Sequence, residues 1–152
     1  MFLLDTTYCS KIIDKDRSLM EHISNNVPKD SYVATSVVSK GELVYMVEKS
    51  ERKEDNKRVV RNFLENIDIQ PVTSKVADVY GELKYNIFSK YAPKEKTKRN
   101  KYTLARLGIT ENDAWIAALA ISMGLTVITK DSDFQRIKDA DNRLNYEEWP
   151  VS

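Results

Sequence analysis

Short apolar runs alternate with longer amphipathic segments along most of the chain, and this alternation limits the fold more than any other feature of the sequence. The runs that read as strands cover residues 2–4, 31–35, 69–72 and 125–129. Apolar residues in the intervening segments recur at spacings of three, four and seven, which predicts helices. Parallel neighbouring strands need crossover connections of this kind. The sequence therefore predicts an α/β fold with a central, mostly parallel sheet flanked by helices.

Turn and capping residues mark where the helices begin and end. Helices are expected over residues 8–26 with a break near 14–16, over 36–49, 55–67 and 74–87, from 110 onward, and again after 130. Ser36, Ser74 and Thr110 are the expected N-caps, because a hydroxyl can accept from an amide of the first turn. Gly124 supplies a C-terminal break, and Pro71 favours a strand at the edge of the sheet.

The length of 152 residues suits one domain, residues 1–152, with a basic loop or insertion near 91–106. The net charge is only +1, from 24 basic and 23 acidic residues, so the charge of the whole molecule does not indicate a polyanionic partner. The single cysteine, Cys9, cannot form an intramolecular disulfide, which favours a reducing, cytoplasmic setting. No apolar stretch approaches the roughly 20 residues that cross a bilayer, so no membrane association is expected.

Four carboxylates stand beside these elements in positions that suit a shared site. Asp5 and Asp131 follow apolar strands, Glu42 lies early in a helix, and Asp113 opens another helix. Ligands of parallel sheets gather at the carboxyl ends of the strands. A carboxylate cluster repels a phosphodiester unless it first binds divalent cations that screen the phosphate and acidify a water. The pattern therefore favours a metal-dependent hydrolase of phosphodiesters.

Each carboxylate also has a simpler structural explanation. Asp5 could form an Asx turn or an N-cap, and Glu42 could face solvent on its helix. Asp113 completes a capping-box pattern, Thr-Glu-Asn-Asp, over residues 110–113. Either Asp131 or Ser132 could serve only as an N-cap. Capping and metal ligation can use different oxygens of one carboxylate, so the two interpretations are compatible.

Several segments, taken in order, resemble a known family. They are Phe-Leu-Leu-Asp-Thr at 2–6, Ser36 through Gly-Glu-Leu at 41–43, Asn-Asp-Ala-Trp-Ile-Ala-Ala at 112–118, Val-Ile-Thr-Lys-Asp-Ser-Asp-Phe at 127–134, and Glu-Glu-Trp at 147–149. Together they resemble the PIN-domain ribonucleases, and within that family the VapC-type toxins of toxin–antitoxin pairs. The likeness spans most of the chain.

The resemblance implies an endoribonuclease that uses Mg²⁺, with Mn²⁺ as a substitute. The implied metal-binding and catalytic residues are Asp5, Glu42, Asp113 and Asp131. The implied supporting residues are Asp133, Thr6 and Thr129. The resemblance also implies an RNA substrate, a homodimer, and a cognate antitoxin whose C-terminal segment wraps the toxin and occludes the site.

Other functions remain open at this point. The chain could be a housekeeping RNA-processing PIN nuclease, or a noncatalytic module that binds RNA or protein. A pure phosphate binder would gain nothing from four convergent negative charges. A phosphatase with Asp5 as covalent nucleophile is a further alternative, because haloacid-dehalogenase-like enzymes begin with a strand ending in Asp. Those enzymes place a second Asp two residues onward, where this chain has Thr7.

Periodicity fails between Tyr91 and Arg106, where basic residues dominate. Six basic residues stand against Glu95 alone: Lys94, Lys96, Lys98, Arg99, Lys101 and Arg106. The simplest interpretation is a solvated loop. The alternative is an RNA-binding arm made by Lys94, Lys96, Lys98, Arg99 and Lys101, with Tyr91 and Tyr102 able to stack on unpaired bases.

Overall fold

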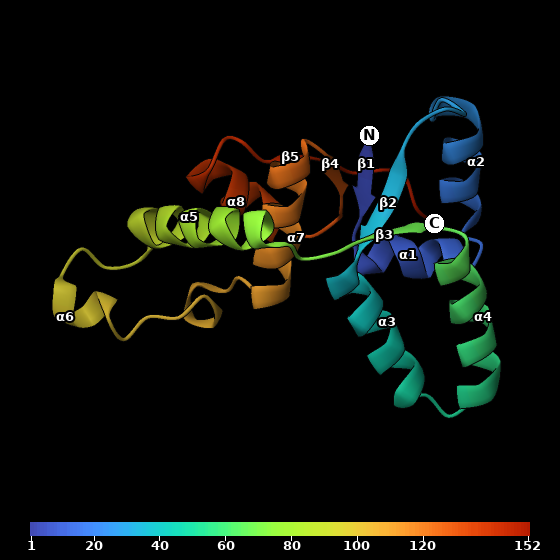
Figure 1. Cartoon of the computed structure of the whole chain (residues 1–152), viewed down its shortest axis with the longest axis horizontal. Helices are drawn as coiled ribbons and strands as arrows, with labels where there is room; N and C mark the ends of the chain where they lie inside the picture. The colour runs from blue at the N-terminus through green and yellow to red at the C-terminus, as the bar shows by residue number, and fades with distance from the viewer.

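Five short strands form one sheet in which every neighbouring pair runs parallel. The computed structural model describes residues 1–152 (Figure 1). The strands are β1 (Phe2–Leu4), β2 (Val33–Ser36), β3 (Asp68–Gln70), β4 (Thr126–Ile128) and β5 (Asn145–Glu147). Their order across the sheet is β3-β2-β1-β4-β5, so β1 lies at the centre. All four pairings are parallel, which confirms the predicted α/β class.

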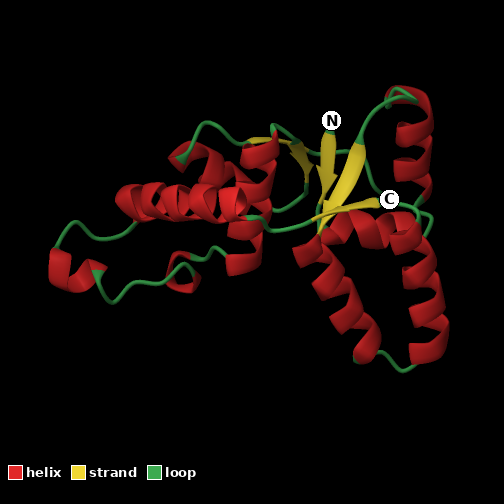
Figure 2. Ribbon diagram, in the orientation of Figure 1, coloured by secondary structure: helices red, strands yellow, loops and turns green.

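The chain also forms eight helices, several of which pack against the sheet (Figure 2). They are α1 (Thr6–Ile13), α2 (Arg17–Asn26), α3 (Val37–Glu48), α4 (Lys53–Glu65), α5 (Ser74–Tyr91), α6 (Lys96–Arg99), α7 (Glu111–Met123) and α8 (Asp133–Ala140), with a 3₁₀ turn at Ala105–Leu107. In Figure 1, α3 and α4 form a hairpin that extends away from the sheet, and α6 lies at the opposite end of the molecule. No helix is long and apolar enough to span a membrane.

Consecutive residues of the central strands point to opposite faces of the sheet, and each face has its own core. Leu3 belongs to a large cluster that includes side chains of α5, α7 and α8. Leu4 belongs to a second cluster with Tyr8, Leu43 and Trp149, which side chains of α1, α2 and α4 extend. Continuous apolar strands are therefore buried on both sides, as parallel sheets require.

The predicted strands and helices are present, but most of their bounds differ from the prediction by one to four residues. β3 covers Asp68–Gln70 where residues 69–72 were expected, and α5 extends to Tyr91, beyond the expected end at 87. The break between α1 and α2 contains Lys15 at a φ of 55°, and α7 runs from the Thr110 cap to Gly124, whose φ is 66°. The left-handed conformation at Gly124 ends the helix at little steric cost. β3 is an edge strand and ends just before Pro71.

One expected cap was wrong, and one strand was missed. The N-cap of α5 is Thr73, whose hydroxyl accepts from the amide of Val76, and not Ser74. β5 was not expected, because its residues Asn-Tyr-Glu form no apolar run. Its place in the sheet comes from pairing with β4, where Val127 lies opposite Tyr146.

Candidate metal centre at the carboxyl ends of the strands

Four elements bring acidic side chains to one cleft at the carboxyl ends of β1 and β4. Asp5 directly follows β1, and its amide donates to the carbonyl of Ile128 in β4 (3.2 Å). The cleft has a volume of about 390 Å³. Its lining includes all four predicted ligands, Asp5, Glu42, Asp113 and Asp131, together with Thr6. Residues more than a hundred positions apart in the sequence thus face the same space.

Three carboxylates lie closest together within this region. One oxygen from each of Asp113, Asp131 and Asp133 can be chosen so that all three lie within 4.8 Å of one another. Asp133 was expected only in a supporting role, but the structure places it in this closest group. Its carboxylate also lies 3.5 Å from a guanidinium nitrogen of Arg136. Asp5 and Glu42 line the cleft together with Asp113 and Asp131, whereas Asp133 lies next to these two residues but does not line the cleft itself.

Asp5 combines burial with a capping role. Asp5 is 7% exposed, and its Oδ1 accepts from the amide of Tyr8 (2.8 Å) at the start of α1. The N-cap expected as a simpler explanation is therefore present. Burial raises the pKa of Asp5, and the charge of Asp131 adds to the rise, whereas hydrogen bonds from Tyr8 and Thr129 oppose it. A carboxylate held this way gains from a nearby cation.

Asp113 shows the strongest sign of an assembled charge cluster. The pKa of Asp113 is raised from 3.8 to about 6, and burial is the largest cause. The charges of Asp131, Glu42 and Asp133 contribute to this rise. The Thr110 hydroxyl donates to Oδ2 (2.7 Å) and accepts from the Asp113 amide (3.1 Å). Thr110 thus caps the helix as predicted, while the Asp113 carboxylate contacts a hydroxyl instead of first-turn amides.

Glu42 is oriented by two hydrogen bonds to its carboxylate. The hydroxyl of Thr6 donates to Oε2, and the side-chain amide of Asn112 donates to Oε1 (2.7 Å). The side chain is only partly exposed, so the expectation of a solvent-facing helical glutamate does not describe it. Asn112 was not identified from the sequence, where its one signal is its place directly before Asp113. Seventy residues separate it from Glu42.

Thr129 and Asp131 organise the turn between β4 and α8. The Asp131 amide donates to the Thr129 hydroxyl (3.0 Å), and Thr129 is 1% exposed. Oδ1 of Asp131 accepts from the amide of Asp133 (2.9 Å), so Asp131 rather than Ser132 satisfies an amide at the start of α8. The same carboxylate is therefore both a local cap and a member of the acidic group.

The donor set suits a hard divalent cation. Every candidate ligand is a carboxylate, and Mg²⁺ and Mn²⁺ prefer oxygen ligands. Raised pKa values at Asp5, Asp113 and Asp133 show that burial and mutual repulsion oppose the charged state of these groups. A bound cation would offset both effects. The residues present therefore fit such an ion.

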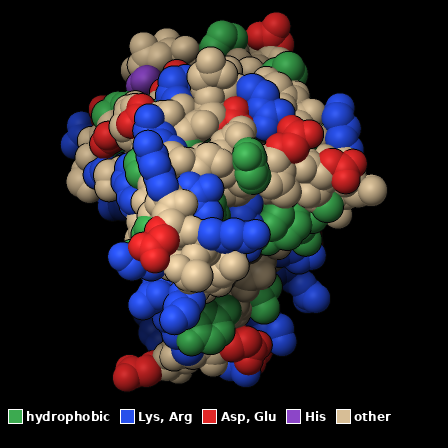
Figure 3. All heavy atoms as spheres, turned by 90° about the vertical axis from the view of Figure 1, so that its left-hand side faces the viewer, with side chains coloured by type: hydrophobic (Ala, Val, Ile, Leu, Met, Phe, Trp, Pro, Cys, Tyr) green, Lys and Arg blue, Asp and Glu red, His purple; other side chains and the backbone are tan.

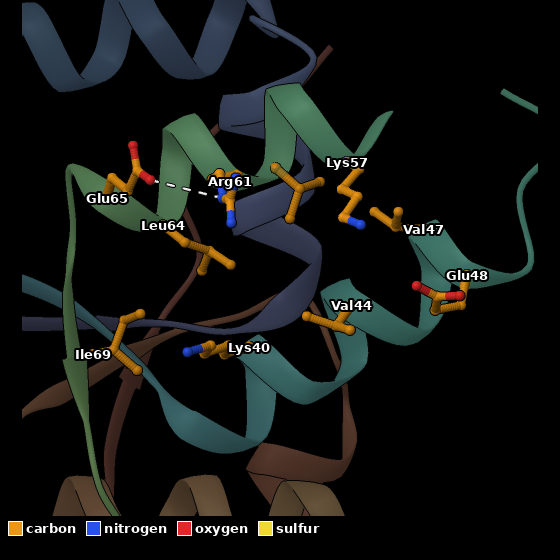
Figure 4. Close-up of a pocket in the computed structure, with 10 residues that line it drawn as sticks. Lys40, Val44, Val47, Glu48, Lys57, Arg61, Leu64, Glu65 and Ile69 are labelled. Carbon is orange, nitrogen blue, oxygen red and sulfur yellow. Dashed lines mark ion pairs between the residues drawn. The ribbon is translucent and has the colours of Figure 1, made fainter. Parts of the chain in front are cut away.

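A second hollow lies on the other side of α3. This α3–α4 groove has a volume of about 340 Å³ and opens between the two helices of the hairpin (Figure 4). Its apolar lining consists of Val44, Val47, Val60, Leu64 and Ile69. Charged side chains of Lys40, Glu48, Lys57, Arg61 and Glu65 surround it. Because Tyr45 and Met46 line the acidic cleft, α3 forms a wall of both hollows.

Comparison with known proteins adds to this geometry. The family described as "PIN domain" matches residues 2–140. Among curated proteins, Ribonuclease VapC2 of Rickettsia felis is 29% identical over 98% of this chain and 98% of its own. The tRNA(fMet)-specific endonuclease VapC of Shigella flexneri is 27% identical over 97% of each chain.

Solved structures show the same likeness along nearly the whole chain. A chain of the promoter-DNA-bound VapBC2 complex from Rickettsia felis superposes with a TM-score of 0.75 at 28% identity, over 98% of both chains. A chain of the DNA-bound VapBC complex from Salmonella typhimurium gives a TM-score of 0.74 at 27% identity, again over 98% of both. The arrangement of strands and helices described above is thus shared with these proteins.

Proposed function

Since the chain belongs to the PIN domain family, we propose that it is a divalent-metal-dependent endoribonuclease and the toxin of a toxin–antitoxin pair. The observation that carries this proposal is the meeting of Asp5, Glu42, Asp113 and Asp131 in one cleft. The ribonuclease names of relatives that match over nearly the full chain support the reaction type. We further propose that a single domain spans residues 1–152, and the packing of Trp149 in the same core cluster as Leu4 supports this.

The acidic side chains would hold Mg²⁺, and Mn²⁺ could replace it. Asp113, Asp131 and Asp133 supply the closest oxygens, and Asp5 and Glu42 complete the walls of the cleft. A bound divalent cation would neutralise phosphate charge and lower the pKa of a water that attacks phosphorus. Hydrolysis by water leaves a 5′-phosphate and a 3′-hydroxyl, because no neighbouring 2′-hydroxyl takes part.

The surrounding residues fix the acidic side chains in place. Thr6 and Asn112 hold both oxygens of Glu42, and Thr110 holds one oxygen of Asp113. The hydroxyl of Thr129 accepts from the Asp131 amide, and Thr129 lowers the pKa of Asp5 against the effect of burial. Such outer contacts orient metal ligands before substrate arrives and reduce the reorganisation needed during reaction.

An RNA cleavage assay tests the proposal. Asp113→Asn keeps the shape of the side chain and loses its charge, so cleavage of a single-stranded RNA in Mg²⁺ should fall at least about 100-fold. Asp30→Asn is the matched control, because Asp30 is exposed in the loop before β2 and outside the cleft. Full activity in Asp113→Asn, or activity that persists with excess EDTA, would contradict the proposal.

The α3–α4 groove is the proposed docking site for the antitoxin. Val44 and Val59 are 43% and 48% exposed on this hairpin, and the groove between its helices is lined by apolar side chains. An apolar segment of a partner chain would bury this surface. The VapBC assemblies among the similar structures favour an antitoxin as that partner, which the protein would meet in the cytoplasm together with its RNA substrate.

A binding experiment separates the toxin from a housekeeping nuclease. The gene adjoining this one should encode a small protein that copurifies with the chain and suppresses its RNA cleavage. Val44→Asp should weaken this complex at least tenfold, since a charge would enter an apolar contact, while leaving cleavage by the free protein intact. Failure of any adjoining product to inhibit would favour the housekeeping role. A homodimer remains a proposal, which analytical ultracentrifugation of the free protein would test.

A further inference from the structure

The modest charge of the whole chain hides a strong separation of charge. The basic arm, defined here as residues 91–106, contains six basic residues and one acidic residue. The rest of the chain therefore contains 18 basic and 22 acidic residues, out of totals of 24 and 23. Positive charge is thus concentrated in one segment, while the remaining surface and the candidate metal centre are net negative.

The basic arm extends from the body of the molecule but is anchored at both ends. In Figures 1 and 2 the segment around α6 reaches away from the sheet, beyond the end of α5. Ala92, Leu104 and Leu107 are buried, and the two leucines belong to the larger core cluster. Viewed from this side, the surface shows many lysine and arginine side chains (Figure 3). The arm is therefore a fixed projection that presents cations to solvent.

Most cations of the arm have no acidic partner. Glu95, the one acidic residue, pairs with Lys98 at 3.0 Å. Lys94, Lys96 and Lys101 are exposed and form no ion pair. The guanidinium groups instead tie the loop together: Arg99 donates to the carbonyl of Pro93 (3.0 Å) and Arg106 to that of Lys101 (3.0 Å). The unpaired lysines are free to interact with an external anion.

The aromatic residues of the arm are less available than the sequence suggested. The Tyr91 hydroxyl donates to the carbonyl of Arg136 (2.7 Å), and the guanidinium of Arg136 lies over its ring at 5.0 Å. The guanidinium of Arg106 lies over the ring of Tyr102, 5.2 Å from its centroid. Both tyrosines are partly buried, and one face of each ring is covered. The arm therefore offers charge to phosphates in preference to stacking surfaces for bases.

The position of the arm in the chain links it to the acidic cleft. Residues after Arg106 run through Gly108 to Thr110, the cap of α7, and then to Asp113. A bound divalent cation would offset only part of the negative charge of the carboxylates in the cleft, so attractive charge outside the cleft would help to hold a polyanion there. From these observations we infer that the basic arm binds the phosphate backbone of RNA, without reading its bases, and retains the strand beside the cleft. This inference rests on the proposed ribonuclease function.

The inference is tested by RNA affinity at several salt concentrations. A single-stranded RNA of random sequence would be titrated with Lys96→Gln/Lys101→Gln in the uncleaving Asp113→Asn background. Loss of two phosphate contacts should lower affinity about tenfold or more near 0.1 M salt and reduce the salt slope by about 1.4. Lys15→Gln/Lys29→Gln, made in the same background, is the matched control, because these lysines are exposed, unpaired and outside the arm. The control should retain the affinity of its parent.

The outcomes separate failure of the arm from failure of the proposed enzyme. Equal affinity and salt slope in the arm variant and the control would overturn the inference, whatever the cleavage assay shows. Unchanged RNA binding together with altered self-association in ultracentrifugation would also overturn it and would place the arm in a protein interface. A loss of affinity that depends on base composition would contradict backbone binding. Thermal melting of each variant should match the Asp113→Asn parent, since none of these lysines forms an ion pair.

Discussion

Removing one charge from the acidic cleft should stabilise the metal-free protein while destroying its function. The pKa of Asp113 is raised from 3.8 to about 6, so the folded state disfavours the carboxylate form of this side chain. A shift of roughly two units corresponds to about 3 kcal/mol at neutral pH. Two effects reduce the stability gained by removing the charge. Solvent screens this partly exposed group, and the variant loses the interaction of a negative charge with the N-terminus of α7, worth up to ~1 kcal/mol. Asp113→Asn should therefore raise the free energy of unfolding by about 1–2 kcal/mol.

The stability difference between Asp113→Asn and the parent should depend on pH. Because the pKa is raised on folding, the cost of ionising Asp113 is absent below about pH 4, develops between about pH 4 and 6, and is fully present above. The variant should thus melt about 2–8 °C higher than the parent near pH 7, from a shift of ~2–4 °C per kcal/mol at this chain length. Near pH 4 the two proteins should melt at almost the same temperature.

Thermal melts in EDTA and in Mg²⁺ would measure the stability of each protein without and with the cation. Saturating Mg²⁺ should stabilise the parent, by about 2.7 kcal/mol at a hundred times its dissociation constant, and should stabilise Asp113→Asn much less. Asp30→Asn should behave like the parent under all conditions. The reasoning is refuted if Asp113→Asn is less stable than the parent in EDTA at neutral pH, or if Mg²⁺ stabilises both proteins equally.

Three further predictions follow from individual contacts. Asn112→Ala removes the amide that holds Glu42, so kcat for RNA cleavage should fall roughly tenfold with little change in melting temperature; an unchanged kcat would show that this contact does not position Glu42. In Asp5→Asn the side chain can still accept from the Tyr8 amide, so this variant should be folded but inactive. Asp5→Ala should also lose about 1 kcal/mol of stability, which urea denaturation would detect. Equal stability of the two variants would argue against a capping role for Asp5. Tyr8→Phe leaves the buried amide and carbonyl of Trp149 without their partner, so unfolding in urea should show a loss of about 2 kcal/mol, and a loss below about 0.5 kcal/mol would contradict that account.

The parts of the fold that were predictable are those in which local chemistry and tertiary packing agree. The break before α2, the cap at Thr110 and the left-handed glycine at 124 depend on short-range sterics and hydrogen bonds. β5 forms only by pairing with the neighbouring strand β4, in which Val127 lies opposite Tyr146. Its sequence carries no periodic apolar signal, so no local interpretation could have found it.

The candidate site, too, was predictable from the sequence only in part. Acidic residues after strands and at helix starts were recognisable, and Asp5, Glu42, Asp113 and Asp131 all line the cleft. Their ranking was not recognisable, since Asp133 lies in the closest group of oxygens. The contact between Asn112 and Glu42 joins two helices and leaves no trace in sequence spacing.

The amino-acid sequence by itself determined the α/β class, the burial of the central strands and the kinds of side chain available for a metal centre. These follow from apolar periodicity and from the turn chemistry of residues close together in the chain. Only the tertiary structure decided which carboxylates share a cleft, how far their pKa values rise, and where the unpaired lysines project. Distances between residues far apart in sequence, and the solvent excluded around them, arise only when the strands pair and the helices pack against the sheet.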